Sequence, residues 1–193
     1  MRSREVHLWW DAGDRSQSEA MVRAVLAGYL DLAPDAVPLV VRHGASPRID
    51  GDDLYVSLSH SEGHIVVAVA RRPVGVDVEC VRGGSVDATL VRRTCTPGER
   101  RALAAEPTRA REAAFLRLWT RKEAVSKAIG AGLALDFAGV DVRGGLVIAA
   151  GRLWRVRDLL APVPGWAAAV ALRGPLAQTR SFDRRRESVG CVC

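Results

Sequence analysis

The chain has 193 residues, of which 48% are hydrophobic and 26% charged, a balance that excludes an intrinsically disordered protein. Its 28 Lys and Arg side chains against 22 Asp and Glu give a formal net charge of +6. No apolar run is long enough to cross a membrane as a helix, and residues 1–10 lack the apolar core of a secretory signal. We therefore expect a cytoplasmic protein with reduced thiols and no membrane partner.

The excess of positive charge suggests an anionic partner, but the charge alone does not identify it. A nucleic acid, a phosphorylated small molecule and an acidic protein would each satisfy it. Part of the excess lies in residues 180–193, where four Arg against one Asp and one Glu contribute +2. Only two of the 28 basic side chains are lysines, Lys122 and Lys127, and they lie five residues apart.

Hydrophobic periodicity in the first 73 residues predicts one helix among several strands. Short apolar runs alternate with Gly- and Pro-rich turns, and one longer segment has apolar residues at helical spacing. The expected elements are strands at 6–10, 37–42, 54–60 and 64–70 and a helix over 16–32.

The remainder of the chain predicts a strand, three helices and further strands. Thr96, Pro97 and Glu99 form the start signal of one helix, and Gly130 ends the longest helix. The expected elements are strands at 74–81, 137–142, 146–157 and 166–172 and helices over 86–95, 97–105 and 109–129.

The two series of elements predict an α+β fold made of two similar α/β halves that meet near Pro73. The N-terminal half comprises residues 1–73 and the C-terminal half residues 74–179. Residues 180–193, which end in Cys-Val-Cys, are expected to form a disordered tail.

Two carboxylates share one face of the strand expected at 74–81. Asp77 and Glu79 lie two residues apart, so their Cα atoms are about 6.6–6.8 Å from each other on a strand. Carboxylate oxygens suit Mg²⁺, which also binds substrate phosphates, and we expect a metal site here. The alternative is an edge strand with a solvated acidic face.

The long helix carries a second set of charges. Glu123 and Lys127 are four residues apart, in the favourable order for a pair on one helix face, and Lys122 borders the apolar stripe. An exposed Glu–Lys pair without function is the alternative. Together with the two strand carboxylates, these side chains predict a site for Mg²⁺ and a polyphosphate, in which ammonium groups contact phosphate oxygens.

The expected strand at 54–60 ends in Ser59-His60. Neighbouring residues on a strand face opposite sides, so these two do not form the Ser–His pair of a hydrolase. His60 is better placed to contact a phosphate, and the alternative is a turn histidine bonded to the backbone.

Three motifs in order resemble the 4′-phosphopantetheinyl transferases of the surfactin-synthetase-activating (Sfp) type. They are Ser59-His60-Ser61, Gly-Val-Asp-Val-Glu at 75–79, and Trp-Thr-Arg-Lys-Glu-Ala-Val-Ser-Lys-Ala-Ile-Gly at 119–130. The last is similar to the subgroup with the Lys-Glu-Ala triplet. Each motif alone is a weak signal, whereas all three in this order are specific.

The resemblance implies roles for these residues. Magnesium would be held by Asp77, Glu79 and Glu123, and coenzyme A phosphates by Ser59, His60, Lys122 and Lys127; Glu123 and Lys127 would be catalytic. The implied reaction transfers 4′-phosphopantetheine from coenzyme A to a serine of an acyl or peptidyl carrier protein and releases adenosine 3′,5′-bisphosphate. The implied fold is a monomer of two pseudo-two-fold halves with the coenzyme between them.

One loop departs from this family. Its members usually have Gly-Lys-Pro before the Ser-His strand, whereas residues 43–48 read His-Gly-Ala-Ser-Pro-Arg. Arg48 is the candidate replacement for the lysine, and Arg15 and Arg23 are candidates for the ribose 3′-phosphate. Two other functions stay open: a basic module that binds nucleic acid, which the three acids argue against, and a non-catalytic relative that binds carriers.

Overall fold

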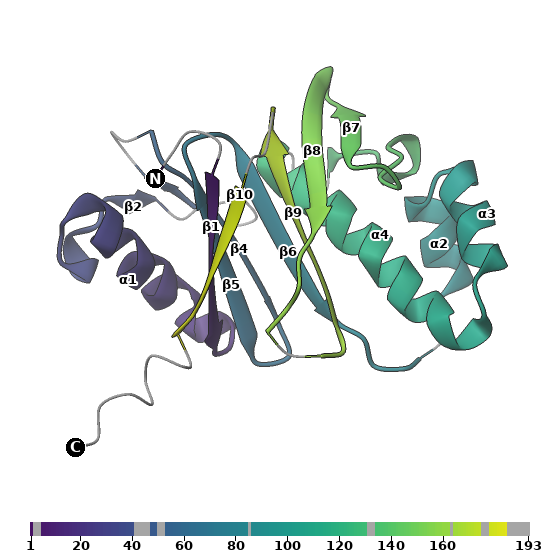
Figure 1. Cartoon of the computed structure of the whole chain (residues 1–193), viewed down its shortest axis with the longest axis horizontal. Helices are drawn as coiled ribbons and strands as arrows, with labels where there is room; N and C mark the ends of the chain where they lie inside the picture. Colours follow the sequence, from purple (N-terminus) through teal and green to yellow (C-terminus); the bar gives the residue numbers. More distant parts are fainter. Residues whose placement is uncertain are drawn as a thin grey trace.

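The computed structural model describes Met1 and residues 5–40, 47–49, 53–84, 86–130, 134–162, 164–174 and 178–184. Figure 1 shows two sheets between α1 (Ser18–Leu30) on one outer side and α4 (Thr108–Ile129) on the other. The short helices α2 (Ala88–Thr94) and α3 (Pro97–Ala105) lie beyond α4. This layered arrangement confirms the expected α+β fold.

The first sheet has six strands in the order β10-β1-β5-β4-β3-β2. Strand β1 lies inside it, antiparallel to β5 and parallel to β10. Its strands are β1 (Glu5–Ala12), β2 (Leu39–Val40), β3 (Arg48–Ile49), β4 (Tyr55–Ser61), β5 (His64–Ala70) and β10 (Gln178–Asp183).

The second sheet has four antiparallel strands in the order β6-β9-β8-β7. They are β6 (Val74–Cys80), β7 (Leu146–Ala149), β8 (Arg152–Asp158) and β9 (Trp166–Arg173). The chain thus changes sheet between Ala70 and Val74. The division into two pseudo-two-fold halves at residue 73 stays a prediction.

Three apolar clusters hold the layers together. One lies between α1 and the first sheet, and one lies between α4 and the second sheet. The third joins the two sheets, where Val74, Val76 and Val78 of β6 meet residues of β1 and β5 such as Trp10 and Val66. Because side chains alternate along a strand, the intervening Asp77 and Glu79 point to the opposite face of β6.

Two expected strands differ in the structure. Residues 137–142 do not form a strand: Phe137–Gly139 is a 3₁₀ helix, η4, with Asp136 as its cap. The strand expected over 146–157 is a hairpin of β7 and β8, because Ala150 and Gly151 both have positive φ and form a tight turn (49° and 65°). Further 3₁₀ helices are η1 (Arg15–Gln17) and η2 (Pro34–Ala36).

The prediction of a disordered tail from residue 180 is wrong for its first residues. Strand β10 pairs in parallel with β1, so residues 180–183 belong to the first sheet. The ring of Phe182 stacks on Trp9 with 4.3 Å between centroids, and Trp10 Nε1 donates to Ser181 Oγ at 2.9 Å. The Cys-Val-Cys end lies outside the described residues. No helix among the described residues is long and apolar enough to cross a membrane.

Candidate active site

The site forms where β6 lies between β4 and α4. Gly75 makes the approach of α4 possible: a Cβ atom there would lie 1.9 Å from the Ala124 carbonyl oxygen and 2.5 Å from the Ala128 nitrogen. On the β4 side, Ser57, Ser59 and Ser61 alternate along the strand and all three hydroxyls bond to β6. Three elements distant in sequence therefore meet along one strand.

Asp77 is the centre of this group. Its carboxylate is buried, and Oδ1 accepts hydrogen bonds from Lys127 Nζ and Ser59 Oγ, both at 2.7 Å. Lys127 also donates to the Val76 carbonyl oxygen at 3.1 Å. The second oxygen, Asp77 Oδ2, is buried and has no donor among the described residues. An uncompensated carboxylate oxygen in the interior is costly unless another group binds it.

Glu79 and Glu123 lie close enough to Asp77 to alter each other's ionisation. Burial raises the pKa of Glu123, and the charges of Asp77 and Glu79 raise it further against the opposing effect of Lys127. Burial and the charge of Asp77 likewise raise the pKa of Glu79, while hydrogen bonds from Ser61 and Trp119 act in the opposite direction. The three carboxylates thus form one cluster with more negative charge than its single ammonium group neutralises.

His60 lies at the end of β4, beside this cluster. Burial lowers the pKa of its imidazole, and the positive charges of Arg15 and Lys127 lower it further. Arg15 therefore lies close enough to His60 to act on it, as do Lys127 and Asp77 of the cluster. Arg23 does not join them, because it pairs with Glu19 at 2.9 Å and donates to the Val37 carbonyl oxygen. The Arg48 backbone lies in β3, and its side chain is outside the described residues.

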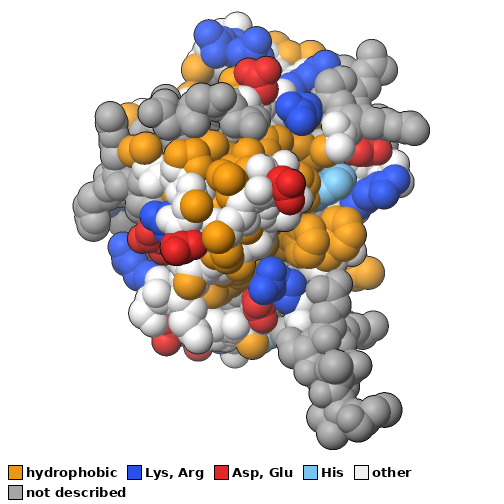
Figure 2. Space-filling view, turned by 90° about the vertical axis from the view of Figure 1, so that its left-hand side faces the viewer, with side chains coloured by type: hydrophobic (Ala, Val, Ile, Leu, Met, Phe, Trp, Pro, Cys, Tyr) orange, Lys and Arg blue, Asp and Glu red, His pale blue; other side chains and the backbone are white. Residues whose placement is uncertain are grey.

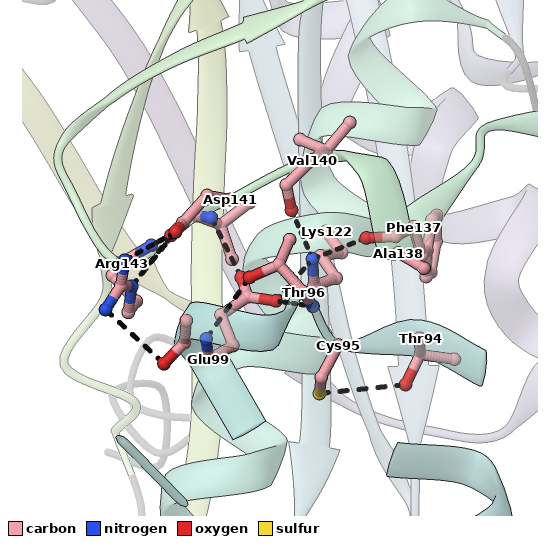
Figure 3. A network of polar contacts seen from close by, with 12 residues as sticks. Thr94, Cys95, Thr96, Glu99, Lys122, Phe137, Ala138, Val140, Asp141 and Arg143 are labelled. Carbon is pink, nitrogen blue, oxygen red and sulfur yellow. Dashed lines mark hydrogen bonds and ion pairs between the residues drawn. The ribbon is translucent and has the colours of Figure 1, made fainter. Parts of the chain in front are cut away.

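Lys122 is the main correction to the predicted site. Its side chain is 1% exposed and ion-paired at 2.9 Å with Glu99, which is 0% exposed. The ammonium also donates to the carbonyl oxygens of Phe137 and Val140, as Figure 3 shows. All three donors are used in the interior on the α3 side of α4, so Lys122 is not a phosphate contact. It faces away because it is the neighbour of Glu123 on a helix, about 100° around the axis.

The buried carboxylate of Glu99 has hydrogen-bond partners for both of its oxygens. Its carboxylate accepts from Lys122 and from the backbone nitrogens of Thr96 and Val142 at 2.8 and 2.9 Å. The capping-box signal Thr96–Glu99 predicted the first backbone bond, but it gave no sign that the same carboxylate holds Lys122 (Figure 3). The pair ties α3, α4 and η4 together behind the active site.

Replacement of Lys122 by Met is expected to destabilise the protein by about 3–5 kcal/mol, since it leaves the Glu99 carboxylate buried without a counter-charge. Urea unfolding measures this free energy. The double variant Lys122→Met/Glu99→Gln is the control and should recover part of the loss. A stable Lys122→Met protein with an impaired affinity for phosphates would contradict this assignment.

Sequence reasoning missed two neighbours of the acids. Ser61 Oγ donates to Glu79 at 3.1 Å, and Trp119 is a further partner of the same carboxylate. The period of two in Ser57, Ser59 and Ser61 was the available signal for Ser61, since it places all three on one strand face.

Fold, acidic cluster and motif order together define a class of protein. The family model of the 4′-phosphopantetheinyl transferase superfamily matches residues 73–151, which include β6 and α4. Curated relatives carry the same name, one of them 36% identical over 66% of its length, and the chain belongs to this superfamily.

Three relatives show the extent of the similarity. A 4′-phosphopantetheinyl transferase of Bacillus subtilis is 30% identical over 126 residues, 65% of this chain and 55% of the relative. HetI of Nostoc sp. is 34% identical over 119 residues, which are 59% of this chain and 50% of the relative. AcpT of Salmonella typhi is 36% identical over 130 residues, which are 67% of this chain and 66% of the relative. The chain spans about half the length of the first two relatives.

Proposed function

We propose that this chain transfers 4′-phosphopantetheine from coenzyme A to a serine of an acyl or peptidyl carrier protein and releases adenosine 3′,5′-bisphosphate. The observation that carries the proposal is the Asp77 carboxylate, with Oδ1 held by Lys127 and Ser59 and Oδ2 buried without a donor in the described part of the chain. Membership of the superfamily supports the same reaction.

Mg²⁺ fits the donors of this site. Asp77, Glu79 and Glu123 offer hard carboxylate oxygens, one of which has no donor among the described residues, and burial and the charge of Asp77 raise the pKa of the two glutamates. Among the described residues, no three His, Cys, Asp or Glu side chains already stand at the spacing of a metal site. The bound cation would neutralise pyrophosphate charge and orient the pyrophosphate.

The chain's own residues carry the remaining steps. The serine oxygen of the carrier attacks the β-phosphorus of coenzyme A, and the bond from that phosphorus to the bridging oxygen breaks. Glu123 takes the serine proton as a general base. Lys127 donates to the leaving α-phosphate, while His60 and Arg15 contact phosphate oxygens. Most of the rate then comes from positioning and charge stabilisation.

In this proposal the protein is a cytoplasmic monomer that binds coenzyme A and a carrier protein. Carriers of this family's systems are acidic, and arginines on α2 to α4 would attract them. Arg117 and Arg121 are already paired with Asp158, so exposed arginines such as Arg93 and Arg101 are left for this role.

A nucleic-acid-binding module would need a contiguous basic face. On the side of the molecule seen in Figure 2, Lys and Arg side chains are separated by apolar and acidic ones. This face does not support that alternative.

Mass spectrometry of a panel of apo-carriers tests the proposal. With coenzyme A and Mg²⁺, at least one acyl or peptidyl carrier should gain the mass of phosphopantetheine, and EDTA should stop the gain. Lys127→Arg should keep the fold and lose at least about a hundredfold in rate, because a guanidinium does not reproduce the compact ammonium donor. No gain on any carrier by a folded protein would favour the non-catalytic relative and reject the proposal.

A further inference from the structure

A cavity of about 600 Å³ opens beside Lys127 where β4 and β6 begin and α4 ends. This volume is in the range that holds a small-molecule ligand. Its apolar wall includes Ile49, Leu54, Ile129 and Trp154. A second hollow of about 280 Å³ shares Tyr55, Pro73 and Arg173 with it. Lys127 thus contacts the acidic cluster and also lines a cavity that continues away from it.

Arginines line both spaces. Arg152 and Arg173 line the larger one, and Arg71 and Arg72 join Arg173 around the smaller one. No described residue that lines either space is acidic. None of these four guanidinium groups has an ion-pair partner within the described ranges, in contrast to Arg121, which is held by Asp158.

The register of the second sheet brings two of these arginines together. Arg173 on β9 lies opposite Trp154 on β8, and Arg152 lies two residues before Trp154. Partners opposite each other in an antiparallel pair, and residues two apart on one strand, project from the same face. Arg152 and Arg173 therefore project toward the face covered by α4, next to the buried ring of Trp154.

We propose that Arg152 and Arg173 bind a second anionic group of the coenzyme, separate from its pyrophosphate. The inference rests on the proposed function, which places the pyrophosphate at Lys127. A ligand that continues into the cavity meets apolar walls and two guanidinium groups that have no ion-pair partner among the described residues. Two parts of the substrate have this chemistry: the 3′-phosphate on the ribose that follows the pyrophosphate, and the carboxylate of a carboxyacyl group at the end of the pantetheine arm.

Isothermal titration calorimetry in the presence of Mg²⁺ separates the two sources. The ligands are coenzyme A, 3′-dephospho-coenzyme A, acetyl-coenzyme A and malonyl-coenzyme A. The proteins are the wild type, the double variant Arg152→Gln/Arg173→Gln and the control Arg157→Gln. Arg157 is exposed on β8 but does not line the cavity. Equal thermal unfolding of all three proteins verifies that the fold is intact.

The double variant is expected to bind the ligand with the recognised anion about tenfold more weakly or worse. If the 3′-phosphate is recognised, wild type and control prefer coenzyme A over its dephospho form and the double variant does not. If a carboxylate is recognised, the lost preference is that for malonyl- over acetyl-coenzyme A. Wild-type affinities of the double variant for all four ligands would overturn the inference. Because binding is measured without a carrier, a failure of carrier modification would count only against the proposed function.

Discussion

Glu123→Gln is expected to lower carrier modification by at least about a thousandfold and, without metal, to make the protein more stable than the wild type. The loss of rate follows because the amide accepts no proton and is a poor magnesium ligand. The gain in stability follows because Glu123 is confined with Asp77 and Glu79 in a half-buried cluster, and burial and their charges raise its pKa. The neutral amide removes that repulsion.

The sign of the pH dependence is fixed by the direction of this shift. A carboxyl group whose pKa is higher in the folded state binds more protons folded than unfolded, so stability falls as pH rises through the folded pKa. The melting temperature of the metal-free wild type should therefore decrease from the ordinary glutamate range upward, and Glu123→Gln should flatten this decrease. Glu106→Gln, at the exposed end of α3, is the control. Equal pH profiles of wild type and Glu123→Gln would contradict the prediction.

Gly75→Ala is expected to destabilise the protein by about 3 kcal/mol, a decrease of roughly 6–12 °C in melting temperature. The new methyl group would lie 1.9 Å from the Ala124 carbonyl oxygen, a backbone atom that has no rotamer with which to move aside. Helix α4 would have to move off β6. The Lys127–Asp77 contact at 2.7 Å would then lengthen. We therefore expect the rate of carrier modification to be lower even at a temperature where the variant is fully folded.

Gly28→Ala is the matched control, because no atom lies within 4 Å of the added methyl group in α1. The substitution should stabilise the helix by about 0.5–1 kcal/mol. Calorimetric unfolding measures both variants, and carrier modification at a temperature where both are folded measures the effect on the site. A Gly75→Ala protein as stable and active as Gly28→Ala would show that β6 and α4 are not locked in this contact.

Much of the site was predictable because it depends on local spacing. The period of a strand placed Asp77 and Glu79 on one face, and the period of a helix placed Glu123 and Lys127 on one face. The acids and His60 were also predicted to be near one another, and the structure does bring them together. That the two acid-bearing elements meet at all depends on Gly75, whose role becomes visible only with Ala124 beside it.

Lys122 was not predictable in the same way. Its charge and its position beside Glu123 made it similar to Lys127, and only the tertiary contact with Glu99 distinguishes a buried structural ammonium from an accessible one. Strand β10 is a second example. The arginines in this segment made it resemble a polar tail, whereas Phe182 stacks on Trp9 and holds the strand in the sheet. Pairings between distant segments leave no periodic signal in a single sequence.

The parallel pairing of β10 with β1 joins two strands that lie far apart in the sequence. Ser181 Oγ receives its hydrogen bond from Trp10, 171 residues earlier in the chain, so this edge of the first sheet depends on a contact of very high sequence separation. The Glu99–Lys122 pair joins residues that are much closer in the sequence, so the packing of α3 on α4 can form before β10 pairs with β1. We therefore expect the β1 edge of the first sheet to be completed late in folding.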